Sequence, residues 1–230
     1  MTEDASVEPS KTTKRNFFVR HAQSEQNIAT CRLKSGDLTA AFTLVGMGYD
    51  APVSETGVVQ LSCARTELDG LVEKYSIALV VHSPLQRAVE TAKAVFGGRG
   101  PPLVEFPGMY ERTVSEYLLP TLMDQRIVNL QRWLATRDET VIALVGHGQF
   151  FKRCLGASQV LQNVAIVECS FDSPTGFSST FDRVFDGYPD PDSELRCPTC
   201  AGSRRFDKLG PSPDVPCAVS LGAPHAVAFR

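Results

Sequence analysis

The sequence lacks a long apolar run, because no stretch approaches the roughly 18 consecutive apolar residues that a membrane-spanning helix needs. The first residues, Met1-Thr2-Glu3-Asp4, are acidic and no apolar stretch follows them, which argues against a secretory signal. A surplus of positive charge is also missing, since the net charge is −3. These absences predict a cytoplasmic protein that has no membrane span and no general attraction to nucleic acid.

Residues that bind metals are sparse as well. The seven cysteines are an odd number and no secretory signal precedes them, so we expect reduced thiols. Cys197 and Cys200 form a Cys-x-x-Cys pair that Cys217 and His225 could complete as a zinc site, but this spacing matches no strong zinc pattern. No cluster of carboxylates suits magnesium. The sequence therefore predicts neither a metal nor a cofactor.

The composition divides the chain into a body and two ends. Residues 1–13 are polar and without periodicity, which predicts a disordered tail. Residues 189–230 are rich in Pro, Gly, Ser and Ala, which predicts an irregular tail. Residues 14–188 are expected to form one catalytic domain, which is long enough to bury a substantial core.

Apolar runs of strand length alternate with helical patterns in the expected domain. The runs Lys14–Arg20, Ile77–Val81 and Val141–Val145 are typical of buried strands. Such alternation predicts an α/β fold with a mainly parallel central sheet covered by helices on both faces, a three-layer α/β/α sandwich. Residues 163–171 and 177–185 predict a hairpin at the edge of the sheet.

Two connecting regions also carry expectations. Ser54 is a suitable N-cap for one long amphipathic helix that ends near Tyr75, with Val58 and Leu68 on its apolar face. Residues 31–47 show no clear period, so we expect either a loop or lid over the pocket or a plain surface connection.

Basic side chains lie at or just past the end of each of the three strands. Arg20 and His21 end the first, Arg87 follows the second, and His147 follows the third. In an open α/β sheet the carboxyl ends of parallel strands gather at one edge, so these side chains can converge. Asn27 lies near the start of an expected helix, where free N–H groups suit an anion. The pattern predicts a phosphate site.

Taken together, these stretches resemble the histidine phosphatase superfamily, also called the phosphoglycerate mutase-like family. Residues 20–22, Arg-His-Ala, resemble the Arg-His-Gly opening of that family, with alanine where glycine is usual. Residues 83–88 are similar to its second motif and residues 146–148 to its third. The order and spacing match over residues 16–171, and the resemblance implies the phosphoglycerate mutase-like three-layer architecture.

Phosphoryl transfer gives each of these residues a task. His21 is the expected nucleophile, because a neutral imidazole nitrogen attacks phosphorus without prior deprotonation by a neighbouring base. Arg20 and Arg87 present planar forks for phosphate oxygens, and Asn27 could donate from the helix start. His147 would donate a further hydrogen bond as charge shifts in the transition state.

Three carboxylates are candidates for the proton donor to the leaving group: Glu105, Glu111 and Glu116. In the family that the sequence resembles, the acid lies in a Leu-x-Glu-like turn after the second motif. Met109-Tyr110-Glu111 matches that turn best. We therefore expect Glu111 to be the catalytic acid.

The predicted function is a metal-independent phosphomonoester hydrolase, a phosphatase that acts through a phosphohistidine on His21. One alternative is a cofactor-dependent phosphoglycerate mutase, which in the family has a glycine-containing segment after the acid, whereas residues 112–120 contain no glycine. The other alternative is an inactive phosphate-binding module. The expected partner is a phosphorylated small molecule or a phosphoprotein.

Overall fold

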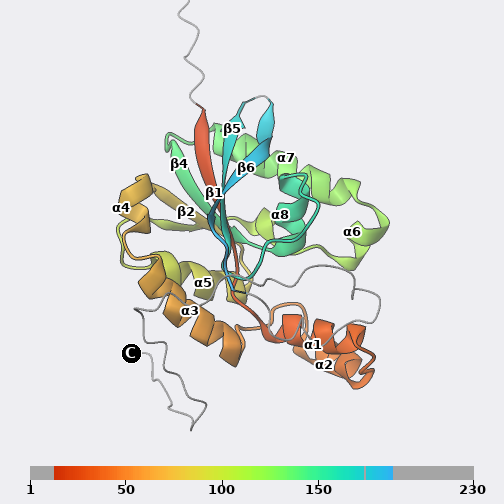
Figure 1. Cartoon of the computed structure of the whole chain (residues 1–230). Coiled ribbons are helices and arrows are strands. Elements are labelled where there is room, and N and C mark those ends of the chain that lie inside the picture. The colour runs from red at the N-terminus through yellow and green to blue at the C-terminus, as the bar shows by residue number, and fades with distance from the viewer. Residues whose placement is uncertain (1–12, 174, 189–230) are drawn as a thin grey trace, which may run out of the picture.

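The computed structural model describes residues 13–173 and 175–188 (Figure 1). A six-stranded sheet lies at its centre, in the order β3-β2-β4-β1-β5-β6. The strands are β1 (Lys14–Arg20), β2 (Leu79–His82), β3 (Leu103–Glu105), β4 (Val141–Gly146), β5 (Ile166–Asp172) and β6 (Gly176–Phe185). Strands β1 to β4 run parallel to one another. Strand β5 runs antiparallel to its neighbour β1, and β6 runs antiparallel to β5. The sheet is therefore mainly parallel, with the predicted hairpin at its edge.

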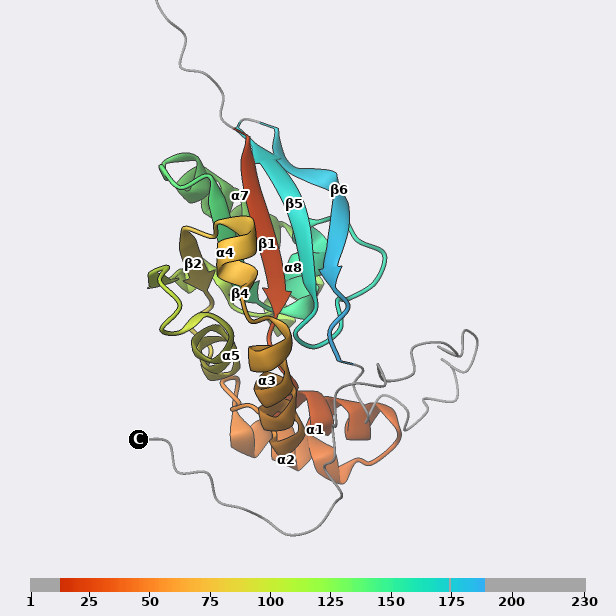
Figure 2. The same cartoon turned by 60° about the vertical axis from the view of Figure 1, so that its left-hand side comes forward.

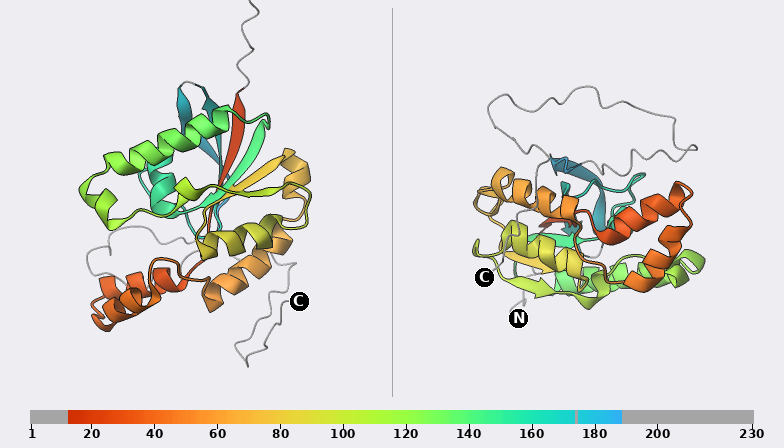
Figure 3. Two further views of the ribbon diagram at one scale, coloured as in Figure 1. Left: turned by 180° about the vertical axis from the view of Figure 1, so that it is seen from behind. Right: turned by 90° about the horizontal axis from the view of Figure 1, so that it is seen from below.

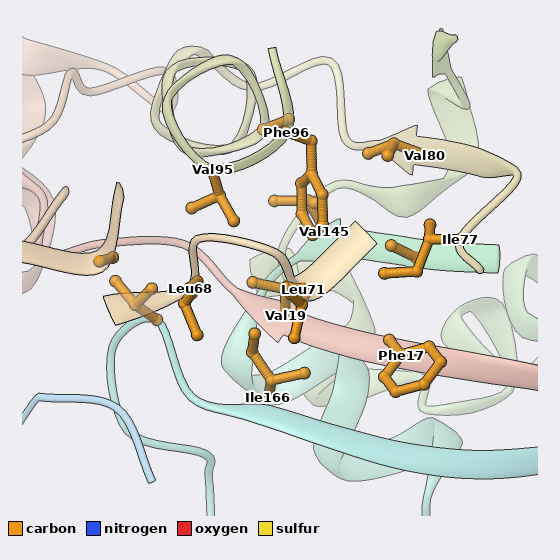
Figure 4. Packing of buried hydrophobic residues seen from close by; sticks show 14 of the residues in the cluster. Phe17, Val19, Leu68, Leu71, Ile77, Val80, Val95, Phe96, Val145 and Ile166 are labelled. Atoms are coloured by element: carbon orange, nitrogen blue, oxygen red, sulfur yellow. The ribbon is translucent and has the colours of Figure 1, made fainter. Parts of the chain in front are cut away.

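Helices cover both faces of this sheet. The helices are α1 (Glu25–Lys34), α2 (Thr39–Met47), α3 (Glu55–Glu67), α4 (Leu71–Tyr75), α5 (Gln86–Phe96), α6 (Val114–Leu118), α7 (Thr121–Ala135) and α8 (Gly148–Cys154). The apolar side chains of α3, α4 and α5 pack on one face of the sheet (Figure 4). Those of α7 and α8 pack on the other face. This confirms the predicted three-layer α/β/α sandwich.

The central strand β1 explains why both faces need a helical layer. Successive side chains of a strand point to opposite faces. Phe17 and Val19 belong to one apolar core and Phe18 to the other, and all three are fully buried. Burial on both sides is what the continuous apolar run in the sequence predicts, and it places the end of β1 in the middle of the domain.

The pair α1 and α2 lies beyond the carboxyl end of β1 (Figures 2 and 3). The expected loop over residues 31–47 is wrong, since most of this region is helical. Asp37 organises the connection, because its carboxylate accepts the Thr39 N–H at 3.0 Å and pairs with Arg32 at 2.7 Å. The sequence of α2 shows no clear one-sided apolar pattern, because Phe42 and Val45 are exposed, at 81% and 83%.

The expected single helix from Ser54 to Tyr75 is two helices. Ser54 caps α3 as predicted, because its hydroxyl accepts the Gly57 N–H at 3.1 Å. The helical path breaks before α4 at Gly70, whose φ of +74° is open to glycine and strained for other residues. The break turns Leu71 and Val72 into the first core, while Val58 stays half exposed.

Several expectations concern residues outside the described ranges. The proposed tails at 1–13 and 189–230 fall there almost entirely, as do Cys197 and Cys200, so the domain boundaries stay predictions. Within residues 13–173 and 175–188, no helix is both long and apolar enough to cross a membrane.

Candidate active site

His21 lies directly after β1, where the strand passes beside β4. Its backbone N–H donates to the Gly146 carbonyl at 2.9 Å, and its side chain is 1% exposed. Nδ1 lies 2.6 Å from the Ala22 carbonyl oxygen. Because a carbonyl only accepts, Nδ1 carries the proton and Nε2 keeps its lone pair. Burial, and then the charges of Arg87 and Arg20, hold the imidazole pKa well below its usual value, so His21 is neutral at pH 7.

His147 faces His21 from the junction of β4 and α8. The two ring centroids are 5.0 Å apart, and His147 is fully buried. Its Nε2 lies 2.7 Å from the Ser83 hydroxyl, while Nδ1 is buried and has no hydrogen-bond partner among the described residues. Burial lowers the His147 pKa far below its usual value, and the charges of His21, Arg87 and Arg20 add to the effect.

Two arginines supply positive charge to both imidazoles. Arg20 donates from Nη1 to the Leu161 carbonyl at 2.6 Å. A Cβ on Gly148 would lie 3.2 Å from Arg20 Nε, so the missing side chain lets the guanidinium approach the start of α8. Arg87, in the first turn of α5, is 1% exposed and donates to the Tyr49 carbonyl at 3.3 Å. The four basic side chains that follow the strand ends are therefore brought together.

Short hydrogen bonds tie the first two motifs to each other. The Ala22 N–H donates to the Thr91 hydroxyl at 3.0 Å, and that hydroxyl donates to the Arg87 carbonyl at 2.7 Å. From the other side, the Asn163 amide donates to the His21 carbonyl at 3.0 Å. The backbone around the imidazole is thus fixed by groups from three separate elements.

Asn27, the predicted donor from the helix start, lies at the third residue of α1. Its side-chain oxygen accepts the Ser24 N–H at 3.1 Å, and its own N–H donates to the Ser24 hydroxyl at 3.4 Å. These bonds form a capping box at the first turn of α1. The structure shows Asn27 in a capping role, and its contact with phosphate stays a prediction.

Glu111 reaches the start of α8, next to His147. Its carboxylate accepts the N–H groups of Gln149 at 3.4 Å, Phe150 at 3.3 Å and Arg112 at 2.8 Å. His147, the N-cap of α8, makes no capping bond with its own side chain, so Glu111 takes that place from another element. The Tyr49 hydroxyl donates to the Glu111 backbone carbonyl.

The other two candidate acids lie in different surroundings. Glu116 is 2% exposed and forms a two-pronged ion pair with Arg126, at 2.7 and 2.8 Å. Glu105 is exposed at the end of β3. Of the three carboxylates, Glu111 is the one bonded to the start of α8, the helix whose N-cap is His147.

Sequence reasoning missed several residues that shape the site: Tyr49, Ser83, Arg126 and Asn163. Ser83 stands inside the second motif, so its place directly after β2 was a usable signal for a partner of His147. Arg126 left no such signal, because it occupies one position of a helical pattern among other polar residues. Among the described residues, no group of three or more His, Cys, Asp or Glu side chains is arranged to hold a metal ion.

A comparison with family models gives a match over residues 17–125 to the histidine phosphatase superfamily (branch 1). Over these residues, slightly less than half of its length, the chain is similar to this superfamily. The match begins in β1, includes His21 and Arg87, and ends in α7, and the resemblance expected from the motifs is confirmed. No curated protein matches the chain.

Solved structures with this histidine phosphatase fold are similar to the chain. One is a putative alpha-ribazole-5'-P phosphatase from Escherichia coli, with a TM-score of 0.51 and 16% identity over 76% of this chain and 97% of that one. Another is a mycobacterial glucosyl-3-phosphoglycerate phosphatase in complex with VO3, with a TM-score of 0.51 and 16% identity over 76% and 100%. At this identity the likeness shows the shared fold.

Proposed function

We propose that the protein is a metal-independent phosphomonoester hydrolase that forms a phosphohistidine on His21. The observation that carries this proposal is the state of the His21 ring, which is neutral and has Nδ1 bonded to a carbonyl and Nε2 available. The charges of Arg20 and Arg87 lower the pKa of both imidazoles. The same charges would stabilise an anionic phosphoryl group beside the nucleophile.

The proposed reaction has two steps. In the first, the lone pair of His21 Nε2 attacks phosphorus, the bond to the ester oxygen breaks, and Glu111 gives its proton to that oxygen. In the second, water attacks phosphorus, the phosphorus–nitrogen bond breaks, and Glu111 takes the water proton. Together the steps convert a phosphomonoester and water into an alcohol and phosphate. Arg20, Arg87 and His147 hold the phosphoryl oxygens throughout.

The match to the superfamily model and the phosphatase names of the similar structures support the reaction class. They leave the substrate to experiment, so phosphorylated small molecules and phosphoproteins both belong in a screen. The mutase and the inactive phosphate-binding module stay as alternatives, and no contact in the site favours either of them. A cytoplasmic location also stays a prediction from the sequence.

Trapping of the intermediate tests the proposal. Labelled substrate should leave phosphate on the protein in a bond that is stable to alkali and labile to acid, and His21→Ala should abolish both the label and turnover. His82→Gln is the control, because it removes another buried histidine, whose Nδ1 lies 2.9 Å from the Ser83 carbonyl oxygen. Activity should persist in EDTA. Labelling of the His21→Ala protein at the normal rate would refute the mechanism.

The same assay separates the alternatives. Release of phosphate without isomerisation of 3-phosphoglycerate identifies a phosphatase. Isomerisation stimulated by 2,3-bisphosphoglycerate identifies a mutase, and binding of phosphate with neither reaction identifies an inactive module.

A further inference from the structure

The turn that holds Glu111 is fastened by a buried arginine outside the sequence motifs. The turn begins with a short 3₁₀ segment, Pro107–Met109. The Nη1 group of Arg126 donates to the Gly108 carbonyl at 2.7 Å and to the Tyr110 carbonyl at 2.8 Å. One nitrogen thus bridges the backbone on both sides of Met109, and the second bond ends on the residue directly before Glu111.

The guanidinium is itself held in one orientation. Nε and Nη2 donate to the two oxygens of Glu116 at 2.7 and 2.8 Å, and both side chains are almost completely buried. The charge also lies 3.8 Å from the centroid of the Tyr110 ring and 4.9 Å from that of Phe150. These partners fix the orientation of the planar guanidinium. The ammonium group of a lysine would not be fixed in this way, because it lacks the planar arrangement of donors.

Glu116 fastens the other side of the same turn. Its carboxylate accepts the Thr113 N–H at 2.8 Å, and its backbone carbonyl accepts from Arg112 Nη2 at 3.1 Å. Glu111 is therefore bracketed, with Arg126 bonded to the residue before it and Glu116 bonded to the two residues after it. The Glu111 carboxylate then reaches the N–H groups of Gln149 and Phe150 on α8.

Burying two charges is a poor way to gain stability, since apolar side chains of similar volume often do as well or better. What the pair supplies instead is a fixed position of the turn. Its bonds to the backbone of the turn end at Gly108, Tyr110 and Thr113, which lie one to three residues from Glu111. A displacement of about 1 Å of a reacting group is enough to lower a rate by about 100-fold.

We propose that Arg126 and Glu116 are a positioning pair that sets the place of the Glu111 carboxyl relative to the leaving oxygen. This inference rests on the proposed function, because it concerns proton transfer by Glu111. It makes a distinctive claim: loss of Arg126 imitates a weakened acid and leaves the phosphate-binding groups in place.

Leaving-group dependence tests this claim. An alkyl alkoxide needs the proton, whereas nitrophenolate leaves readily without it. In single-turnover burst measurements, Arg126→Met should lower the rate for an alkyl phosphate relative to that for nitrophenyl phosphate by about 10-fold to 100-fold. Arg126→Lys should show a smaller change in this ratio, because an ammonium keeps the charge opposite Glu116. A change should remain, because one ammonium cannot hold two carbonyls and a carboxylate together.

The chain offers a matched control on the same helix. Asp124 of α7 forms a two-pronged ion pair with Arg153 of α8, at 2.7 and 2.8 Å, and both side chains are largely exposed. Arg153→Met removes a pair with the same two distances, here between α7 and α8, without touching residues 108–112. It should leave the alkyl-to-aryl ratio unchanged.

Each outcome of these measurements either supports or overturns the positioning role of Arg126. Equal losses for both leaving groups in Arg126→Met would overturn the proposal and leave Arg126 a purely structural residue. The same follows if Arg126→Met changes the ratio as much in a Glu111→Gln background as in the native chain, since a positioning residue acts only through the group it positions. If circular dichroism shows that Arg126→Met is unfolded, Arg126→Lys and Glu116→Gln decide by the same ratio. Failure of the proposed function would look different, because the native protein would then give no burst and no phosphohistidine.

Discussion

The two halves of the candidate site are built in different ways. The half assigned to phosphate consists of Arg20, His21, Arg87 and His147, which lie at strand ends or in the first turn of a helix. Of these, His21, Arg87 and His147 are at most 1% exposed. The half assigned to the leaving group consists of Tyr49 and Glu111, which lie in turns between helices. The sheet holds the first half, and side-chain bonds between elements hold the second.

Surface character differs in the same way. In the phosphate half His21, Arg87 and His147 are buried, whereas in the leaving-group half Tyr49 follows α2 and Glu111 precedes α6. Both of these helices expose apolar side chains, including Phe42 at 81% and Val114 at 80%. The contrast indicates that the geometry of the phosphate half follows from the fold, while that of the other half depends on a few specific contacts that substitutions can remove singly.

The largest effect should follow from damage to the phosphate half. In the proposed mechanism Arg87 holds phosphoryl oxygens in both steps, so Arg87→Met should lower kcat/KM on the order of 10³ or more, by analogy with arginines that stabilise phosphoryl transfer. The loss should be equal for alkyl and nitrophenyl phosphates. Arg99→Met is the control, because Arg99 lies past the far end of α5 and bonds to the carbonyls of Leu68 and Arg65. A loss confined to alkyl substrates would show that the two halves are not separate.

The second-largest loss of activity should follow from substitution of Glu111, in the leaving-group half. Glu111→Gln keeps size and polarity but cannot donate an acid proton, so phosphorylation of His21 by alkyl phosphates should fall on the order of 10² or more. The nitrophenol burst should fall much less. Steady-state rates can fall with both substrates, since in the proposed mechanism Glu111 also takes the proton of the attacking water, and the burst is therefore the measurement to make. Equal burst losses would exclude Glu111 as the acid, and Glu105→Gln, an exposed carboxylate, serves as the control.

The same division explains what the sequence could predict. The phosphate half was predictable because an apolar run locates a strand, parallel strands end at one edge, and the residues after Arg20 and Val145 must then lie together. Their convergence needed no knowledge of any side-chain contact. The fold class followed from the same alternation of strands and helices.

The leaving-group half was less predictable because its contacts join residues distant in sequence without a periodic pattern. The turn at Glu111 could be located only by its resemblance to a family motif, and its fastening by Arg126 could not be located at all. The helix α2 was missed for a related reason, since it exposes Phe42 and Val45 and so lacks the one-sided apolar pattern that identifies a helix.

A smaller loss of activity should follow from removal of the hydroxyl that contacts the His147 ring in the phosphate half. The Ser83 hydroxyl contacts His147 Nε2 at 2.7 Å and accepts the Leu85 N–H at 3.2 Å, so it fixes the tilt of the imidazole. Ser83→Ala should lower kcat/KM by about 10-fold, in line with the modest worth of one hydrogen bond. Alkyl and aryl substrates should be affected equally. Ser115→Ala, an exposed serine of α6, is the control, and a change confined to alkyl phosphates would place Ser83 with the leaving group instead.

The smallest expected effect is the dependence of the free energy of unfolding on pH. His21 and His147 have pKa values well below their usual value because they are buried beside the positive charges of Arg87 and Arg20. Below about pH 6.5 the unfolded chain binds protons at these positions while the folded chain does not. Stability is therefore full above that pH and falls as the pH is lowered towards the folded-state values, by at most about 1.4 kcal/mol per histidine for each unit.

Urea unfolding at pH 7.5, 6.5 and 5.5 measures this effect in a range that lies above the ordinary carboxylate pKa values, about 3.9 for Asp and 4.3 for Glu. The free energy of unfolding should fall with pH in the native protein and should fall less steeply in His147→Asn, whatever that substitution does to stability at pH 7.5. Comparison of slopes removes the effect of the altered packing. A slope that is the same in both proteins would mean that His147 accepts a proton in the folded state, and the phosphate half would then contain a third cation at acidic pH.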